Sequence, residues 1–160
     1  MKGKAYLLGD NVGGDQIISG AYLASGKSPE ECISHMFEDC RTDFAQVYRP
    51  GDIIAAGENF GCGSSREMVV VLMKKAGIRC VVAKSFSRNF YRSGINMGIL
   101  PVICPADIRD GDEIEVDLEG GTVTVNGSES YGFAAFPEQV LAYINEGSLL
   151  AYFKKHHSLV

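Results

Sequence analysis

A short apolar strand that runs into a glycine-rich turn and then into a helix constrains this chain more than any other feature. The strand is expected at residues 52–56, where four consecutive apolar residues follow Asp52. The turn Gly57-Glu58-Asn59-Phe60-Gly61-Cys62-Gly63 comes next, and its three glycines permit backbone torsions that other residues resist. A chain with this order turns sharply at the end of the strand and presents backbone amides outward. Such a turn is suited to building a site.

The residues after the turn are predicted to form a helix. Ser64 and Glu67 stand at the spacing of a capping box, which satisfies free backbone N–H groups at a helix start. Apolar residues then recur at helical spacing until Gly77, namely Met68, Val69, Leu72, Met73 and Ala76. Free N–H groups, the hydroxyls of Ser64 and Ser65 and the guanidinium of Arg66 together favour binding of an anion such as a carboxylate or phosphate.

A second apolar strand is expected at residues 78–83, directly after this helix. Strand, helix and strand in this order predict a parallel βαβ unit with the glycine-rich turn at the carboxyl end of its first strand. Ligands bind at that edge of open α/β sheets. Residues 113–118 and 122–125 alternate apolar and polar side chains around Gly120-Gly121, which predicts an antiparallel hairpin with one wet face.

The rest of the chain is read as one further strand and several helices. A strand is expected at residues 4–8, followed by a loop that ends near Asp15. Ser28 and Glu31 form another capping box, for a helix expected to run to about Cys40. Other helices are expected at residues 85–93, 137–146 and 148–153.

Composition narrows the class of protein. A length of 160 residues predicts a single domain spanning residues 1–160. The net charge of −5 argues against a nucleic-acid partner. The sequence shows neither a basic leader with an apolar core nor an apolar run near the ~20 residues that span a bilayer, so we expect a cytoplasmic protein without a membrane partner.

The five cysteines are odd in number and contain no Cys-x-x-Cys pair. This pattern argues against a disulfide framework and against a metal or iron–sulfur site within the chain. We expect reduced and mostly buried thiols. Cys62 is the expected exception, because its glycine-rich loop leaves it accessible.

Residues 57–67 resemble the signature of the swivelling domain of the aconitase superfamily, and the short chain resembles the small subunits of 3-isopropylmalate dehydratase and its homoaconitase relatives. Other segments fall in the order that this family uses, namely Gly9-Asp10-Asn11-Val12, Asp15-Gln16-Ile17-Ile18, Arg49-Pro50-Gly51-Asp52, Ala83-Lys84-Ser85-Phe86, Phe90-Tyr91-Arg92 and Ile95-Asn96. The resemblance covers residues 4–103. It implies a three-layer β/β/α swivelling domain with a short parallel βαβ core and an antiparallel hairpin.

The activity implied by the resemblance is that of a hetero-oligomeric hydro-lyase. Such an enzyme moves a hydroxyl between adjacent carbons of a small hydroxy acid by dehydration and rehydration, here most simply from 2-isopropylmalate to 3-isopropylmalate in leucine biosynthesis. The small subunits of a homoaconitase or a 2,3-dimethylmalate dehydratase are the alternatives. The family's four-iron four-sulfur cluster is implied on a separate, larger subunit, so this chain alone is expected to be inactive.

The resemblance also implies roles for individual residues. Ser64 matches an alkoxide base, and Ser65 and Arg66 match substrate-binding positions. Asp15 matches an aspartate that orients the site, although Gly14 replaces the threonine that usually precedes it. The supporting residues are Asn59, Gly61, Gly63 and Glu67. This sequence also departs from the family pattern at Met68, where histidine is usual, and at Ser93.

The segment 22–28 corresponds to a loop that selects the substrate in the resembling enzymes. Ala24 stands where an arginine fits a distal carboxylate. Burying a carboxylate without a paired donor costs several kcal/mol, whereas an apolar wall gains roughly 0.8 kcal/mol per buried CH₂. Ala24 therefore favours an alkyl malate over homocitrate. Lys27 leaves homocitrate open, since a mobile loop can bring its ammonium to a carboxylate.

Other functional classes fit the residues less well. A serine hydrolase needs a histidine base, and the chain offers only His35, His156 and His157 and lacks a Gly-x-Ser-x-Gly elbow. A nucleotide-binding module needs Gly-x-Gly-x-x-Gly or the Walker lysine, and neither is present. A non-catalytic swivel-domain partner stays open, and so does a purely structural role for Ser64 as a helix cap.

Overall fold

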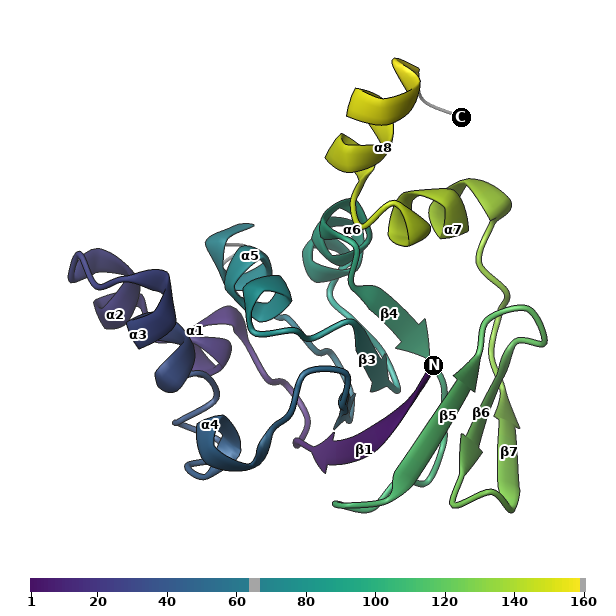
Figure 1. Ribbon diagram of the computed structural model, residues 1–160. Coiled ribbons are helices and arrows are strands. Elements are labelled where there is room, and N and C mark those ends of the chain that lie inside the picture. The colour runs from purple at the N-terminus through teal and green to yellow at the C-terminus, as the bar shows by residue number, and fades with distance from the viewer. Residues whose placement is uncertain (64–66, 159–160) are drawn as a thin grey trace.

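A computed structural model describes residues 1–63 and 67–158 (Figure 1). The expected catalytic Ser64 and the expected substrate-binding Ser65 and Arg66 therefore lie outside the described residues. The strands are β1 (Lys2–Leu7), β2 (Ile53–Ala56), β3 (Cys80–Ala83), β4 (Leu100–Ile103), β5 (Glu113–Asp117), β6 (Thr122–Val125) and β7 (Glu129–Gly132). The helices are α1 (Gly14–Ile17), α2 (Gly20–Ala24), α3 (Pro29–Ser34), α4 (Phe44–Val47), α5 (Glu67–Lys75), α6 (Arg88–Met97), α7 (Glu138–Asn145) and α8 (Leu149–His156).

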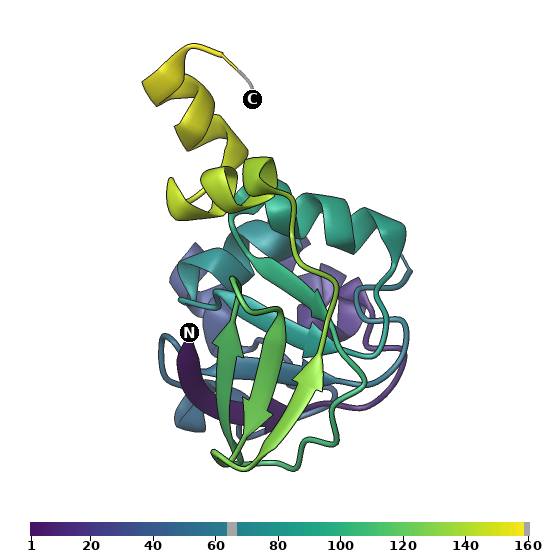
Figure 2. The ribbon, with the colours of Figure 1, turned by 90° about the vertical axis from the view of Figure 1, so that its right-hand side faces the viewer.

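The strands form one seven-stranded sheet in the order β4-β3-β2-β1-β5-β6-β7. The strands from β4 to β1 are parallel, and those from β1 to β7 are antiparallel. β1 joins the two halves, because Ala5 pairs with Ile53 of β2 while Lys2 pairs with Glu115 of β5. Figures 1 and 2 show the antiparallel half curling away from the parallel half.

Two apolar cores separate three layers. Strand residues alternate between the faces of a sheet, so Tyr6, Ile54 and Val81 pack toward the helices while their chain neighbours face the other side. Those neighbours include Ile53 and Val82, which pack against the antiparallel half of the sheet and α7. The expected β/β/α arrangement with a parallel βαβ core and an antiparallel hairpin is confirmed, and β7 extends the hairpin to three strands.

The central helix α5 follows the predicted apolar pattern with one correction. Val69, Leu72 and Met73 are buried as expected, but Met68 is 53% exposed and therefore lies outside the buried stripe. Gly77 ends the helix as predicted, with a φ of +88° and with the next amide, that of Ile78, bonded back to the Met73 carbonyl.

Several other elements differ from the sequence-based expectation. The helix expected from Ser28 to about Cys40 ends at Ser34, and Phe37 adopts a φ of +60°. The segment expected as a loop at 22–28 begins inside α2. α6 begins at Arg88 rather than residue 85, because Ser87 caps it by accepting a hydrogen bond from the Phe90 amide at 3.2 Å.

The C-terminal helices α7 and α8 form where they were expected, with Ser148 capping α8. α8 projects from the body of the molecule above α6 and α7 (Figures 1 and 2). Within the described residues, none of the helices is long and apolar enough to cross a membrane.

Candidate active site

Three loops gather at the carboxyl ends of the parallel strands, and the first two run side by side. They are residues 8–13 after β1 and residues 57–63 after β2. The Asn11 amide donates to the Glu58 carbonyl at 2.7 Å, and the Gly61 amide donates to the Val12 carbonyl at 2.7 Å. Farther along, the Gly14 amide donates to the Cys62 carbonyl at 3.1 Å. The glycine-rich turn is thus paired along its length with the segment that leads into α1.

The third loop, residues 84–87 after β3, holds the glycine-rich turn from the other side. The Phe60 amide donates to the Ser85 carbonyl at 3.0 Å, and the Ser87 amide returns a bond to the Phe60 carbonyl at 2.9 Å. The Ser87 hydroxyl donates to the Gly61 carbonyl at 2.6 Å. The Phe60 side chain is fully buried and packs edge-on against Phe90, with ring centroids 4.9 Å apart. Residue 60 therefore anchors the turn to α6.

Side chains connect the three loops as well. The Ser85 hydroxyl accepts a hydrogen bond from the Asn59 amide at 2.8 Å and donates to the Glu58 carboxylate. The Asn59 side-chain amide donates to Asn11 Oδ1 at 3.0 Å, and the Glu58 amide donates to Asp10 Oδ1 at 2.7 Å. These bonds fix the direction in which the turn leaves β2 before it reaches residues 64–66.

Close packing requires glycine at residue 61, where a Cβ would stand 2.2 Å from Phe90 Cβ. A Cβ at Gly57 would stand 1.7 Å from Asp10 Oδ1 and would displace the carboxylate that accepts the hydrogen bond from the Glu58 amide. Gly61 and Gly63 also adopt φ of +76° and +78°, a region that glycine enters at little cost. At Gly63 a Cβ would meet no described atom within 4 Å.

The structure brings most of the expected supporting residues to one edge of the sheet. Asp15 is the second residue of α1 and follows the bridge between Gly13 and Cys62. Gln16 holds the start of that helix by accepting a hydrogen bond from the Gly13 amide at 2.9 Å. Asn59, Gly61 and Gly63 belong to the adjoining turn. Glu67 is the first residue of α5 and is exposed.

Ala24 and Lys27 belong to a separate neighbourhood formed by α2 and α3. Both residues are exposed. The Lys27 ammonium lies 4.0 Å from Glu31 and 6.0 Å from the centre of the Tyr22 ring. Residues 18 and 19 link α1, which carries Asp15, to α2, which ends at Ala24. The chain therefore links Ala24 and Lys27 to the site through residues 18 and 19. The side-chain contacts of Lys27 are with Tyr22 of α2 and Glu31 of α3.

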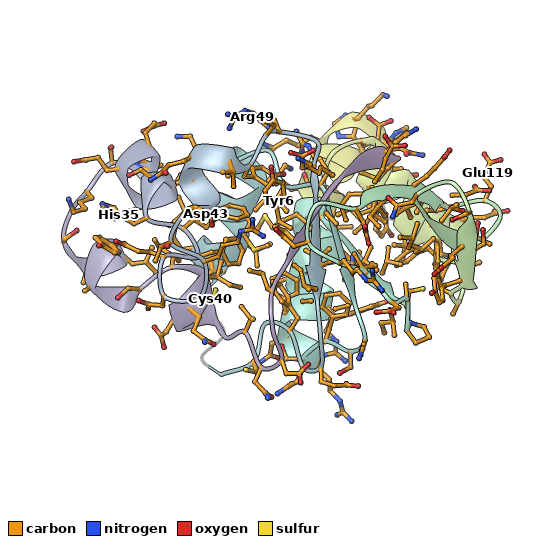
Figure 3. The ribbon with its side chains drawn as sticks, turned by 90° about the horizontal axis from the view of Figure 1, so that it is seen from below. Tyr6, His35, Cys40, Asp43, Arg49 and Glu119 are labelled. Carbon is orange, nitrogen blue, oxygen red and sulfur yellow. The ribbon has the colours of Figure 1, made fainter. Side chains whose placement is uncertain are left out.

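A stacked aromatic pair joins α2 to the end of α3. The rings of Tyr22 and His35 stack at 4.1 Å, and Glu38 Oε2 lies 3.1 Å from the Tyr22 hydroxyl and 2.9 Å from His35 Nδ1. Hydrogen bonds from His35 and then Tyr22 hold the pKa of Glu38 below its ordinary value. A cleft of about 430 Å³ lies beside the pair and is lined by Gln16, Ser19, Ala21, Tyr22, His35, Glu38 and Asp39. Figure 3 shows His35 among these helices and Glu119 at the opposite end of the molecule.

The cysteines do not fit an iron–sulfur cluster. Among the described residues, no group of three or more His, Cys, Asp or Glu side chains is placed to hold a metal ion. All five thiols are unpaired, and Cys32, Cys80 and Cys104 are buried, which raises the pKa of Cys80 to about 12. Cys62 is partly exposed, with its Sγ 3.3 Å from the Asn11 carbonyl. Cys40 is exposed, contrary to the expectation for the set as a whole.

Sequence reasoning assigned no role to Ser85 or Ser87, although both hold the glycine-rich turn. Ser85 stood within one of the segments that carry the resemblance, and Ser87 stood within the expected helix. One feature of the sequence could have indicated this role, namely the position of both serines just after a buried strand, where the carboxyl ends of parallel strands meet. Their partners lie more than 20 residues earlier in the chain, so the contacts depend on the pairing of β2 with β3.

The matching family is described as the aconitase C-terminal domain, and its model covers residues 30–107. The chain is 43% identical to 3-isopropylmalate dehydratase small subunit 1 of Thermotoga maritima over 162 aligned residues, which cover 99% of this chain and 97% of the relative. It is 40% identical to the methanogen homoaconitase small subunit of Methanothermobacter thermautotrophicus, with 97% and 91% covered.

The fold has a close counterpart among solved structures. The crystal structure of a 3-isopropylmalate dehydratase from Methanocaldococcus jannaschii matches with a TM-score of 0.90 and 40% sequence identity, covering 98% of this chain and 94% of that chain. The three-layer β/β/α fold, with a glycine-rich strand-to-helix turn at the carboxyl edge of its parallel strands, thus defines a domain of the aconitase type. The chain belongs to the aconitase superfamily, in the family of 3-isopropylmalate dehydratase and homoaconitase small subunits.

Proposed function

We propose that this chain is the small subunit of a cytoplasmic, hetero-oligomeric hydro-lyase that interconverts 2-isopropylmalate and 3-isopropylmalate by dehydration and rehydration, in leucine biosynthesis. The observation that carries the proposal is the glycine-rich turn, which the loops after β1 and β3 hold at the carboxyl edge of the parallel strands. Identity of about 40% along nearly the whole chain to small subunits with this name supports the same assignment.

The base in this proposal is Ser64. The reaction requires removal of a weakly acidic proton beside a carboxylate, and a serine hydroxyl loses its own proton far above neutral pH. Preorganised amides and a nearby positive charge stabilise the alkoxide that results. Ser64 follows Gly63 and shortly precedes Glu67, the first residue of α5, so the chain joins it to both the turn and the helix start. Arg66, two residues later in the chain, supplies the positive charge in this proposal.

The substrate carboxylate is assigned to Ser65 and Arg66. A guanidinium binds both oxygens of a carboxylate through two parallel hydrogen bonds, and a serine hydroxyl adds a third donor. Asp15, at the start of α1, is assigned the orienting role next to the turn. We assign the four-iron four-sulfur cluster, and the chemistry of the departing hydroxyl, to the large subunit, because the described thiols do not form a ligand set.

We assign recognition of the alkyl substituent of the substrate to Ala24, at the end of α2. A methyl side chain offers no donor to a second carboxylate, and the cost of burying that carboxylate unpaired exceeds what apolar contact returns. Lys27 supports homocitrate as the second candidate, since its ammonium is exposed and its ion pair with Glu31 is long, at 4.0 Å. Similarity to a homoaconitase small subunit points the same way.

Anaerobic reconstitution with the large subunit of the same organism tests the proposal. Alkene formation is followed by ultraviolet absorbance from isopropylmalate, homocitrate, citrate and dimethylmalate. We expect turnover of isopropylmalate, a loss of about 10²-fold or more in Ser64→Ala, and no change in Ser130→Ala, whose hydroxyl pairs with Thr124 in the antiparallel half. Preference for homocitrate would overturn the substrate, undiminished activity of Ser64→Ala would overturn the base, and turnover without the large subunit would overturn the division of labour.

A further inference from the structure

Acidic and basic residues are distributed unevenly along this chain. The 39 residues from 68 to 106 contain no Asp or Glu, although the whole chain has 20 of them against 15 Lys and Arg. The cations in this stretch are Lys74, Lys75, Arg79, Lys84, Arg88 and Arg92. The remainder of the chain therefore holds nine cations against all 20 acidic residues, a net charge of −11, while this stretch carries +6.

Some of these cations are matched within the fold and others are not. Lys75 pairs with Glu30 at 2.7 Å, and the Lys74 ammonium donates to the Gly147 carbonyl. Lys84, Arg88 and Arg92 are exposed, and within the described parts of the chain none of the three forms an ion pair. We refer to these three residues as the α6 cation patch. Arg88 and Arg92 are four residues apart on a helix and so share one face.

The patch lies at the edge of the sheet where the candidate site is built. Lys84 directly follows β3, and Ser85 and Ser87, which follow it in the connection to α6, bind the glycine-rich turn. Figure 2 shows α7 and α8 lying over the C-terminal part of α6, whereas its first turns extend beyond them toward the loops.

We propose that the α6 cation patch docks against an acidic surface of the large subunit. The inference rests on the proposed function, in which Ser64 and the large subunit act on one substrate, so the edge that carries the glycine-rich turn must face that subunit. Exposed cations that form no ion pair among the described residues are available to acidic groups of a partner that lies opposite them. Arginine is also enriched in protein interfaces. The strongly negative remainder of the chain makes nucleic acid a poor partner.

The test measures association and not turnover. The dissociation constant for the large subunit is determined by isothermal titration calorimetry under anaerobic conditions without substrate, at 50 and 500 mM NaCl. We expect binding of the unaltered chain to weaken with salt, because the screening length of exposed charges falls from about 10 Å at 0.1 M to about 3 Å at 1 M salt. Arg88→Glu/Arg92→Glu is expected to weaken binding by at least about tenfold at low salt and to reduce or reverse the salt dependence.

Two further variants separate charge from other effects. Arg88→Lys/Arg92→Lys keeps both charges and is expected to bind with a salt dependence like that of the unaltered chain. Lys154→Glu reverses one exposed charge near the end of α8, and we expect its affinity to stay within about twofold. Urea unfolding checks that each variant is folded. Equal binding by Arg88→Glu/Arg92→Glu would overturn the inference and leave the proposed function standing, whereas failure of the unaltered chain to bind the large subunit would contradict both.

Discussion

Asn11 and Asn59 adopt the same left-handed backbone conformation, with φ of +55° and +59°, and the Asn59 side-chain amide donates to Asn11 Oδ1 at 3.0 Å. Asparagine tolerates this region better than most residues, because its short polar side chain bonds locally. The hydrogen bond therefore ties together the sharpest points of two loops that arrive from different strands. The direction of the glycine-rich turn depends on this pair.

Substitution of Asn59 separates the backbone contribution from the side-chain contribution. Asn59→Gly and Asn59→Ala both remove the bond to Asn11, but only alanine carries a Cβ into the left-handed region. We expect Asn59→Ala to be less stable than Asn59→Gly by about 1 kcal/mol, measured as the free energy of unfolding in urea. Equal stabilities would show that the loop relaxes out of this conformation.

Gly61 and Gly63 offer a matched pair for close packing. Their φ values are +76° and +78°, so the conformational cost of a Cβ is about the same at both positions. A Cβ at Gly61 would overlap Phe90 at 2.2 Å, whereas one at Gly63 meets no atom of the described residues within 4 Å. We expect Gly61→Ala to lose at least about 2 kcal/mol more stability than Gly63→Ala in the same urea measurement. Similar losses would mean that α6 moves aside without cost.

Asp110 is expected to make stability depend on pH. Its carboxylate accepts a two-point ion pair from Arg41, whose guanidinium also lies 4.9 Å from the Tyr6 ring centre, and hydrogen bonding by Arg41 lowers the pKa of Asp110. A folded-state pKa below the unfolded value stabilises the fold above about pH 4, and this stabilisation is lost as pH falls through the folded value.

Because the Asp110 side chain is half exposed and solvent screens its ion pair, Asp110→Asn is expected to cost about 0.5 to 1 kcal/mol at pH 7, and the difference from the unaltered chain should shrink below about pH 4. Urea unfolding at pH 7 and pH 3 measures both values. Glu113→Gln serves as the control, because the Lys2–Glu113 pair is exposed at both side chains and such pairs contribute little. A pH-independent cost would assign the effect of Asp110 to packing.

Ala24→Arg tests the substrate assignment. An arginine at this position adds the two-point donor that a distal carboxylate requires. We expect the ratio of kcat/KM for homocitrate to that for isopropylmalate to rise at least about tenfold in the reconstituted enzyme. Ala135→Arg adds the same charge at an exposed position between β7 and α7 and is expected to leave the ratio near its original value. A rise in both variants would point to general electrostatic attraction.

The sequence predicted the parts of the fold that have a clear period or a capping signal. The βαβ unit and the hairpin follow from apolar runs and strict alternation, and the capping box at Ser28 is present in the structure. β4 was missed because its apolar segment contains Pro101, which a central strand would not accept, whereas β4 lies at the edge of the sheet. β7 was missed because most of its residues are exposed and do not alternate.

The location of the candidate site could be predicted from the sequence, whereas most of the hydrogen bonds and packing contacts that hold it could not. The glycine spacing at 57, 61 and 63 indicated a turn at the end of β2, and the structure has that turn. The hydroxyl of Ser85 on the Asn59 amide joins residues 26 apart, and it exists only after β2 and β3 have paired. A contact between residues this far apart cannot be predicted from patterns of neighbouring residues. The same holds for Gly61, whose requirement for glycine comes from Phe90 on another element.

Because β1 pairs with β2 on one side and β5 on the other, it is fully paired only after most of the chain has been synthesised. The strand is made first, yet Ala5 needs Ile53 on one side and Lys2 needs Glu115 on the other. Until residue 115 has left the ribosome, one edge of β1 presents unpaired N–H and C=O groups that other chains can bind. Aggregation of incomplete chains should therefore fall sharply once β5 has been translated, and chains truncated before residue 113 should be the least soluble of a nested series.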